Sequence, residues 1–187
     1  MVRAGSIAKG MVLLMKDEPY VVTEREFVNP GKGSAFVRLK LKSLRTGQVL
    51  RETLKSNESA EEADVYDKDG QFLYADESGY HFMDAETYEQ YLIERGGLEE
   101  KGTYMKEGDT YRIMMWENRP IDIVLPLKMT FTVVEAQQAV KGDTVTGASK
   151  VVTLETGRQV KVPLFIKPGD KVLVNTETGE YVERVNS

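Results

Sequence analysis

The chain of 187 residues has no cysteine and a single histidine, His81. Without cysteine it can form no disulfide, thiolate nucleophile, iron–sulfur cluster or cysteine-ligated zinc site, and one imidazole excludes any site that needs two. The longest early apolar run, residues 11–15, is followed by Lys16 and is too short for a signal peptide or a membrane span. We therefore expect a cytoplasmic protein that does not associate with membranes.

The signature motifs of common enzymes are missing as well. The sequence has no Gly-x-Ser-x-Gly, no P-loop and no Gly-x-Gly-x-x-Gly after an expected strand. Many Asp and Glu residues fall within residues 58–100, which leaves a carboxylate pair for acid–base catalysis open as an alternative. Such runs are usually solvated surface. We expect no catalytic residue, no metal and no cofactor, and thus a protein that is not an enzyme.

The charges are unevenly distributed. The whole chain carries 25 Lys and Arg against 30 Asp and Glu, a net charge of -5. Residues 64–127 are strongly acidic, with 15 acidic and 6 basic side chains. Residues 28–55 are instead basic, since Glu52 is their only acid and their bases are Lys32, Arg38, Lys40, Lys42, Arg45, Arg51 and Lys55. This segment predicts a local surface that attracts anions although the protein as a whole is acidic.

Residues 36–42 alternate between apolar and basic side chains, with the period of two that is typical of a strand. The apolar side chains would face a core, and Arg38, Lys40 and Lys42 would share the opposite face. Three like charges on one face repel one another unless solvent or an anion compensates them. Two interpretations remain open: an edge strand that its charges protect from aggregation, or a surface that binds phosphates.

This strand is predicted to belong to a long hairpin. Residues 20–28 and 35–44 are rich in β-forming side chains, and the strongest turn signal of the sequence, Asn-Pro-Gly-Lys-Gly-Ser at residues 29–34, joins them. A second turn signal at residues 45–48 then returns the chain into a further strand. The pattern predicts a small barrel or curled sheet with a projecting hairpin.

The tip of the hairpin would present one lysine between two glycines. Gly31 and Gly33 give access to positive φ and let another surface approach closely, while Pro30 fixes the backbone before the turn. Lys32 would then project from the end of two long strands without a neighbouring side chain to shield it. The alternative is an ordinary solvated loop.

The rest of the chain consists mainly of short strands separated by Gly-containing turns, which is typical of small barrels such as the five-stranded oligonucleotide-binding type. One short helix is predicted after Asp84, because Asp caps helices well and Tyr88, Tyr91 and Leu92 have helical spacing. Units of about 60 residues bury too little surface to be stable alone, so they should support one another. The polar boundaries separate residues 1–63, 64–127 and 128–187.

Residues 26–38 resemble the first-domain hairpin of bacterial elongation factor P. The resemblance covers essentially the whole chain in the family's order, because it continues at residues 44–47, 80–84, 141–144, 150–169 and 179–185.

Two departures from the family's pattern matter. Lys150-Val151-Val152 stands where the family usually has Lys-Pro-Ala, which affects the local loop shape. Residues 1–4 and 7–11 are also similar to the paralogous elongation-factor-P-like protein. The paralogue is an alternative assignment, but the intact turn at residues 30–33 favours the factor itself.

The resemblance implies a mostly β protein of three small β-barrel domains in an L-shaped, tRNA-like arrangement. The N-terminal barrel with its hairpin would cover residues 1–63, and oligonucleotide-binding-like domains would cover residues 64–127 and 128–187. Such a protein would be a translation elongation factor that binds the ribosome beside peptidyl-tRNA and relieves stalling at consecutive prolines. Its partners would be the ribosome, peptidyl-tRNA and rRNA, and it would act as a monomer.

The same resemblance assigns a role to the hairpin tip. Lys32 matches the lysine that reaches toward the peptidyl-transferase centre and that, in many members, a lysine-modifying enzyme extends covalently. Pro30, Gly31 and Gly33 form its loop. From the residues themselves, we add the basic face of the strand as the part that binds the tRNA or rRNA backbone. It consists of Arg38, Lys40 and Lys42.

Further contacts are implied near the C-terminus. Tyr181 and Arg184 match positions close to the small subunit or the tRNA anticodon arm. A third-domain loop near exit-site mRNA is matched by Gly142, Asp143, Thr144 and Gly147.

A general RNA-binding barrel protein remains the alternative from another class of function. Its binding to RNA would fall with salt, but it would not need Lys32.

Overall fold

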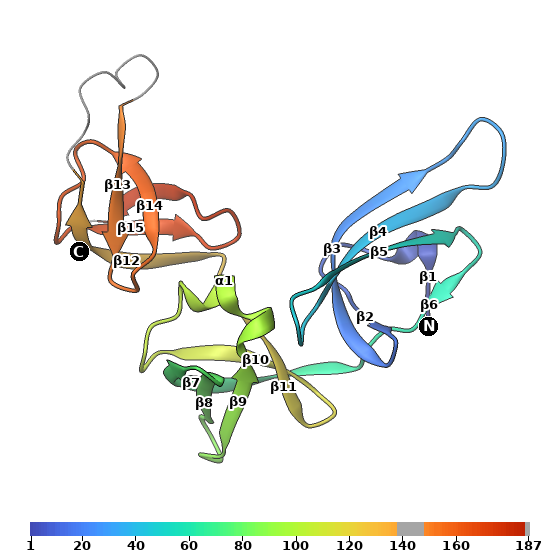
Figure 1. Ribbon diagram of the computed structural model, residues 1–187, viewed down its shortest axis with the longest axis horizontal. Helices are drawn as coiled ribbons and strands as arrows, with labels where there is room; N and C mark the ends of the chain where they lie inside the picture. The colour runs from blue at the N-terminus through green and yellow to red at the C-terminus, as the bar shows by residue number, and fades with distance from the viewer. Residues whose placement is uncertain (138–147, 186–187) are drawn as a thin grey trace. The chain divides into compact units, whose positions relative to one another are not determined.

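The computed structural model describes residues 1–137 and 148–185 (Figure 1). Strands predominate, which confirms the mostly β class predicted from the sequence. The chain forms two compact units: the first contains Met1–Glu99 and Thr110–Val124, and the second contains Glu100–Asp109 and the chain from Leu125 onward. The three domain ranges expected from the sequence stay predictions. No helix in the described part of the chain has the length and apolar character that crossing a membrane requires.

The first unit begins with a four-stranded antiparallel sheet. Its strands follow the order β2 (Val12–Met15), β3 (Glu18–Val28), β4 (Phe36–Ser43) and β5 (Val49–Lys55). Two further elements belong to this part of the chain. They are a short ladder of β1 (Val2–Arg3) with β6 (Ser59–Ala60), and the 3-10 turn η1 (Ala4–Ser6). The core of this part includes Ile7, Leu13, Val22 and Leu41.

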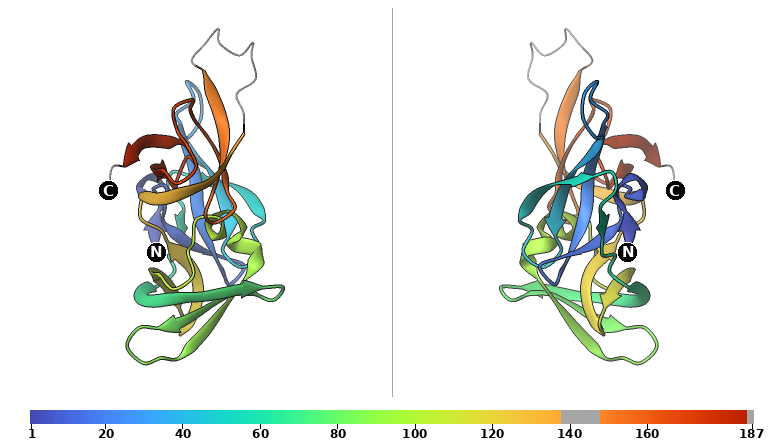
Figure 2. Two further views of the ribbon diagram at one scale, coloured as in Figure 1. Left: turned by 90° about the vertical axis from the view of Figure 1, so that its left-hand side faces the viewer. Right: turned by 90° about the vertical axis from the view of Figure 1, so that its right-hand side faces the viewer.

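Strands β3 and β4 form the predicted long hairpin. Val28 pairs with Phe36, and β5 ends at Lys55 opposite the same Phe36, so residues 29–35 extend beyond the neighbouring strand (Figures 1 and 2). The alternation predicted for β4 is confirmed, since the three apolar residues expected to face the core are at most 3% exposed. These residues are Val37, Leu39 and Leu41.

A five-stranded antiparallel sheet completes the first unit. Its strands are β7 (Val65–Asp76), β8 (Gly79–Asp84), β9 (Gln90–Glu94), β10 (Thr110–Trp116) and β11 (Arg119–Val124), in the order β11-β10-β7-β8-β9. The 3-10 turn η2 (Arg95–Gly97) and the single helical turn α1 (Glu99–Gly102) follow β9. Phe82, Ile113 and Ile123 are fully buried in this sheet's core.

The prediction of a helix after Asp84 is wrong. Residues 90–94 form β9, where Tyr91 pairs with Phe82 of β8. Asp84 Oδ1 accepts the N–H groups of Glu86 and Thr87 at 2.8 and 3.1 Å, so the capping residue forms a turn between two strands. These two hydrogen bonds lower the pKa of the Asp84 carboxyl.

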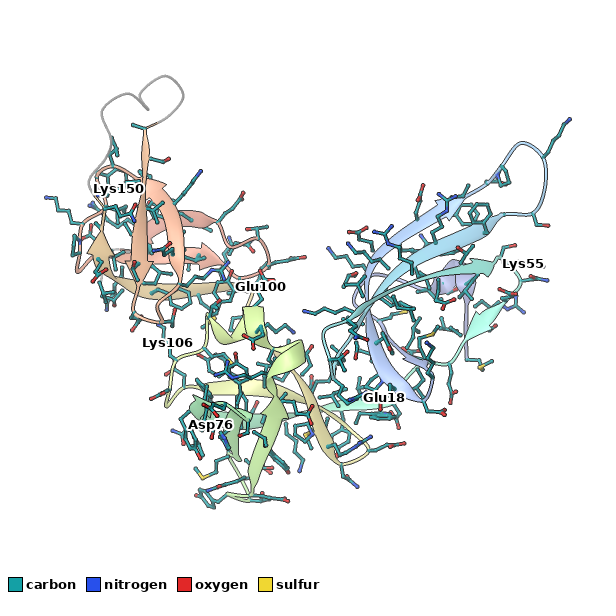
Figure 3. All side chains as sticks on the ribbon, viewed as in Figure 1. Glu18, Lys55, Asp76, Glu100, Lys106 and Lys150 are labelled. Carbon is teal, nitrogen blue, oxygen red and sulfur yellow. The ribbon has the colours of Figure 1, made fainter. Side chains whose placement is uncertain are left out.

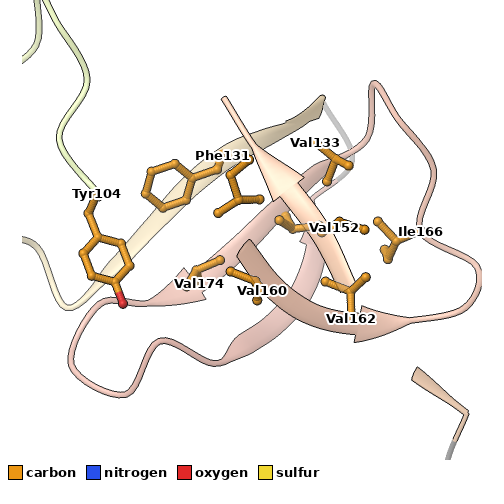
Figure 4. Close-up of a cluster of buried hydrophobic side chains, with 10 residues drawn as sticks. Tyr104, Phe131, Val133, Val152, Val160, Val162, Ile166 and Val174 are labelled. Carbon is orange, nitrogen blue, oxygen red and sulfur yellow. The ribbon is translucent and has the colours of Figure 1, made fainter. Parts of the chain in front are cut away.

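The second unit is a five-stranded sheet around one core (Figures 2 and 4). Its strands are β12 (Lys128–Ala136), β13 (Ser149–Leu154), β14 (Gln159–Pro163), β15 (Lys171–Asn175) and β16 (Tyr181–Val185), in the order β14-β13-β12-β15-β16. Tyr104 belongs to this core although it comes from the separate segment Glu100–Asp109, and its ring centroid lies 6.1 Å from that of Phe131. Lys106 of the same segment forms an ion pair with Glu155 at 3.1 Å (Figure 3).

Candidate nucleic-acid interface

The tip of the β3–β4 hairpin is open on all sides. Lys32 is exposed and makes no hydrogen bond or ion pair with the residues that the structure describes. Gly33 has a φ of 103°, a conformation that favours glycine, whereas Gly31 is not among the residues with positive φ. A Cβ atom placed on either glycine would meet nothing within 4 Å. The ammonium group of Lys32 is therefore free to enter a site on another molecule.

The basic face of β4 carries acidic partners that the sequence analysis did not place there. Arg38 pairs across the ladder with Glu26, and their closest charged atoms are 3.8 Å apart. Lys40 pairs with Glu24 in the same way, at 3.3 Å. Both acids lie before residue 28 and thus outside the basic segment of residues 28–55. Their spacing of two in β3 is the sequence signal that could have revealed them, because cross-strand charge pairs stabilise antiparallel ladders.

The basic face also extends onto β5. Arg51 pairs in register with Lys40, and Lys42 pairs with Val49. A shallow depression of about 510 Å³ lies on this side of the sheet and is lined by Arg38, Lys40, Arg51 and their acidic neighbours. Arg51 was one of the bases noted in the sequence, but no role was assigned to it. Arg25 also lines the depression, which thus offers alternating charges with four cations that a phosphate could contact.

The predicted C-terminal residues lie on one strand, β16, on either side of a bulge. Tyr181 pairs with Val174 and packs against the core of the second unit, so it is only partly exposed. Arg184 pairs with Val172 and is exposed, with its guanidinium carbon 5.3 Å from the centroid of the Phe165 ring. Phe165 is itself 54% exposed and was missed by sequence reasoning.

The predicted third-domain loop lies outside the described residues. It comprises Gly142, Asp143, Thr144 and Gly147. The departure at residues 150–152 falls within regular structure, because Lys150, Val151 and Val152 pair with Val162, Lys161 and Val160 of β14.

The single histidine, in β8, contacts the turn between β7 and β8. His81 Nε2 lies 3.0 Å from Asp76 Oδ2 (Figure 3) and stacks on Tyr74, with ring centroids 4.3 Å apart. Ser78 Oγ donates to Asp76 Oδ1 at 2.5 Å and is 3.5 Å from the same His81 nitrogen. The hydrogen bonds from Ser78 and His81 lower the pKa of Asp76 to about 2.

Three family models match the chain in order. The Elongation factor P (EF-P) KOW-like domain matches residues 3–60, the Elongation factor P (EF-P) OB domain matches residues 65–123, and Elongation factor P, C-terminal, matches residues 129–184. The predicted class of small β-barrels is thereby confirmed. The lysine tip and the basic face both lie within the KOW-like match.

Whole-chain relatives give the same result. The chain is 52% identical over 187 residues to the elongation factor P of Treponema denticola, covering 100% of both chains. It is 50% identical over 187 residues to that of Borrelia hermsii, covering 98% of this chain and 97% of the relative. Among solved structures, eukaryotic translation initiation factor 5A from Methanococcus jannaschii matches with a TM-score of 0.50 and 20% identity, over 66% of this chain and 90% of that one. This last likeness concerns the fold alone.

Proposed function

Because the chain belongs to the elongation factor P family, and is thus a translation elongation factor, we propose that it binds the ribosome beside peptidyl-tRNA and stimulates peptide-bond formation where consecutive prolines cause stalling. One observation carries the proposal: Lys32 is exposed on an open glycine loop beyond the end of the neighbouring strand. A solvated surface loop needs no such reach, whereas a group that must enter a deep RNA site does.

The proposed mechanism is catalysis by positioning, in which no side chain of this protein makes or breaks a bond. Proline restricts its own φ and the backbone of the residue before it, so a polyproline end holds the reacting ester in a poor geometry. Lys32 would steady the aminoacyl end of the peptidyl-tRNA. Alignment of reactants contributes up to about 7–11 kcal/mol in favourable cases. A small part of this effect is enough to relieve a stall.

The basic face of the hairpin would bind the backbone of tRNA or rRNA. Arg38 and Lys40 each have a carboxylate partner in the free protein, but exposed pairs of this kind contribute only about 0.2–1 kcal/mol. A phosphate also forms charge-assisted hydrogen bonds with a guanidinium or an ammonium group, so it can replace the carboxylate. Lys42 and Arg51 would extend the contact along the sheet.

The proposal includes four further parts. Lys32 would be extended covalently by a modifying enzyme, which lengthens its reach without a cofactor. Tyr181 and Arg184 would contact the small subunit or the tRNA anticodon arm. The protein would act as a monomer on cytoplasmic ribosomes. The loop near exit-site mRNA would be formed by Gly142, Asp143, Thr144 and Gly147.

The test is translation of a Pro-Pro-Pro reporter on purified ribosomes, with each protein purified from its native host. The native protein should raise the rate of full-length product, and Lys32→Ala should not. Lys167→Ala, which removes an exposed lysine from the β14–β15 connection, is the control and should act like the native protein.

Two outcomes would contradict the proposal. If the native protein and Lys32→Ala both bind ribosomes and neither changes the rate, the paralogue or a general RNA-binding module becomes the better assignment. If both relieve the stall equally, the positioning role of Lys32 is wrong even though the protein acts in translation.

A further inference from the structure

The two sheets of the first unit meet through their backbones at three glycines. The turn between β4 and β5 lies against η2, the 3-10 turn that follows β9. A Cβ atom on Gly97 would lie 2.2 Å from the carbonyl oxygen of Leu44, and one on Gly96 would lie 2.8 Å from that of Thr46. From the other side, a Cβ atom on Gly47 would lie 2.3 Å from the carbonyl oxygen of Gly96. No other residue type fits these distances without displacing the backbone. We call this arrangement the glycine contact.

An apolar cluster lies beside the glycine contact and also draws on both sheets. Val12 comes from β2 of the first sheet, Leu44 from the turn that follows β4, and Trp116 from the end of β10 in the second sheet. These residues are buried, and Trp116 is only 7% exposed. The Arg119 guanidinium lies over the indole, with its central carbon 4.9 Å from the ring centroid. The sheets therefore share buried side chains in addition to the backbone contact.

Both partners of the glycine contact are held by their own hydrogen bonds. In the turn, the buried Ser43 hydroxyl accepts the N–H groups of Arg45 and Thr46 at 3.2 and 3.1 Å. In η2, Arg95 Nε donates to the backbone oxygen of Asp76 at 2.7 Å. Neither partner can change its own backbone conformation without breaking these bonds. The contact thus joins two preformed pieces of backbone.

The glycine contact lies at one end of β4, and the loop that carries Lys32 lies beyond the other end. At about 3.3 Å per residue, the eight residues of β4 span roughly 25 Å. A rotation of about 10° at the contact would move the far end by roughly 4 Å, far more than the ~1 Å misplacement that already costs about 100-fold in a positioned reaction. Positioning by Lys32 therefore requires a stiff connection at this point.

We propose that Gly47, Gly96 and Gly97 are positioning residues that fix the first sheet on the second and so aim Lys32 at its target. The inference rests on the function proposed above, because it assigns these glycines a role in that same reaction. The proposal does not place these three glycines in contact with the ribosome.

Gly97→Ala, with Gly5→Ala as its matched control, tests the proposal. Both glycines lie in 3-10 turns and neither has a positive φ, but a Cβ on Gly5 would meet nothing within 4 Å. Because the chain has no cysteine, spin labels can be placed uniquely through Lys55→Cys at the end of β5 and Glu77→Cys in the turn between β7 and β8. The native protein and Gly5→Ala should give one narrow distance distribution, and Gly97→Ala a broad or shifted one.

A second readout uses Trp116, the only tryptophan of the chain. In Gly97→Ala its emission should shift to longer wavelength and its quenching by acrylamide should increase. In the Pro-Pro-Pro reaction, Gly97→Ala should lower the maximal rate by about tenfold or more, and raise the half-saturating protein concentration much less. Gly5→Ala should leave both values unchanged.

An unchanged distance distribution in folded Gly97→Ala would overturn the proposal, and so would a broadened distribution with the native maximal rate. Gly96→Ala, whose Cβ meets Thr46 at the longer distance, is the milder variant to measure if Gly97→Ala does not fold. If the native protein gave no stall relief, the proposed function would fail. The distance distributions, recorded without ribosomes, would still decide whether the glycine contact holds the sheets together.

Discussion

At the scale of single residues, the charged side chains of the hairpin differ in how they are prepared for binding. Lys32 lies in open solvent with no partner among the described residues, while Arg38 and Lys40 face Glu26 and Glu24 across the ladder. The paired cations each have a carboxylate partner on the neighbouring strand in the free protein. The unpaired lysine keeps its conformational freedom, which would suit the proposed modification and insertion of this group.

Removal of Arg38 should weaken ribosome binding in a salt-dependent way. Arg38→Ala should reduce the slope of log affinity against log salt by about 0.7–0.9, the effect of one lost phosphate contact. Glu24→Gln should instead strengthen binding, because it frees Lys40 and removes a carboxylate from the path of a phosphate. Sedimentation with ribosomes at several salt concentrations measures both effects. An unchanged slope for Arg38→Ala would show that this residue contacts no phosphate.

The carboxyl of Asp76 should make stability depend on acid pH. Its pKa of about 2 in the folded protein lies below the unperturbed value of 3.8, so folding favours the ionised form. This contribution is complete above about pH 4 and is lost as the pH falls through 2. The melting temperature of Asp76→Asn should therefore be lower than that of the native protein at pH 6, and the difference should shrink between pH 4 and pH 2. A constant difference over this range would contradict the assignment.

At the scale of elements, strands were predicted correctly where either an alternating pattern or a strong turn motif dominated the local sequence. The period-two pattern of β4 and the Pro-Gly-Lys-Gly turn led to the correct hairpin. The segment after Asp84 was predicted wrongly, because Asp caps a helix and closes a turn with the same hydrogen bonds to following N–H groups. Three apolar positions with helical spacing were too few to decide between these structures.

Elements that depend on distant partners were not predictable from local patterns. The role of Glu24 and Glu26 depends on the register between β3 and β4. The segment Glu100–Asp109 has no local feature that connects it with strands more than twenty residues later. The glycine contact likewise joins residues about fifty positions apart, and neither turn alone indicates that it meets the other.

The stability of the second unit should depend on this distant segment. Tyr104 is 1% exposed in the core, so Tyr104→Ala should lower the free energy of unfolding by about 3–5 kcal/mol, as for other buried aromatic residues. Tyr104→Phe should be close to neutral, because the buried hydroxyl has no hydrogen-bond partner among the described residues. Urea unfolding followed by circular dichroism compares the two variants. Equal destabilisation by both would point to an interaction of the hydroxyl.

At the scale of the whole molecule, the comparisons confirm the family and the barrel class expected from the sequence. The exposed lysine and the basic face lie in the first unit, while Tyr181 and Arg184 lie in the second. Along the sequence, the acidic residues 64–127 lie between the two regions for which RNA contacts are proposed. Charge averaged over the chain therefore conceals the parts that are proposed to bind RNA.

Two probes of unfolding should report the two units separately. Trp116 lies in the first unit and is the only tryptophan, whereas circular dichroism follows the strands of both. In Tyr104→Ala, the transition measured by circular dichroism should move to lower urea, and the transition measured by fluorescence should stay at the native midpoint. Equal shifts of both transitions would show that the whole chain unfolds cooperatively as one body.

The place of Tyr104 in the chain also limits how this protein can recombine with its relatives. Strands β10 and β11 separate the tyrosine segment from the barrel whose core it completes. A crossover that exchanged only the chain from Leu125 onward would combine a barrel from one parent with a tyrosine segment from another. The two pieces should therefore be inherited together, and hybrids should be stable when residues 100–109 and 125–187 come from the same parent.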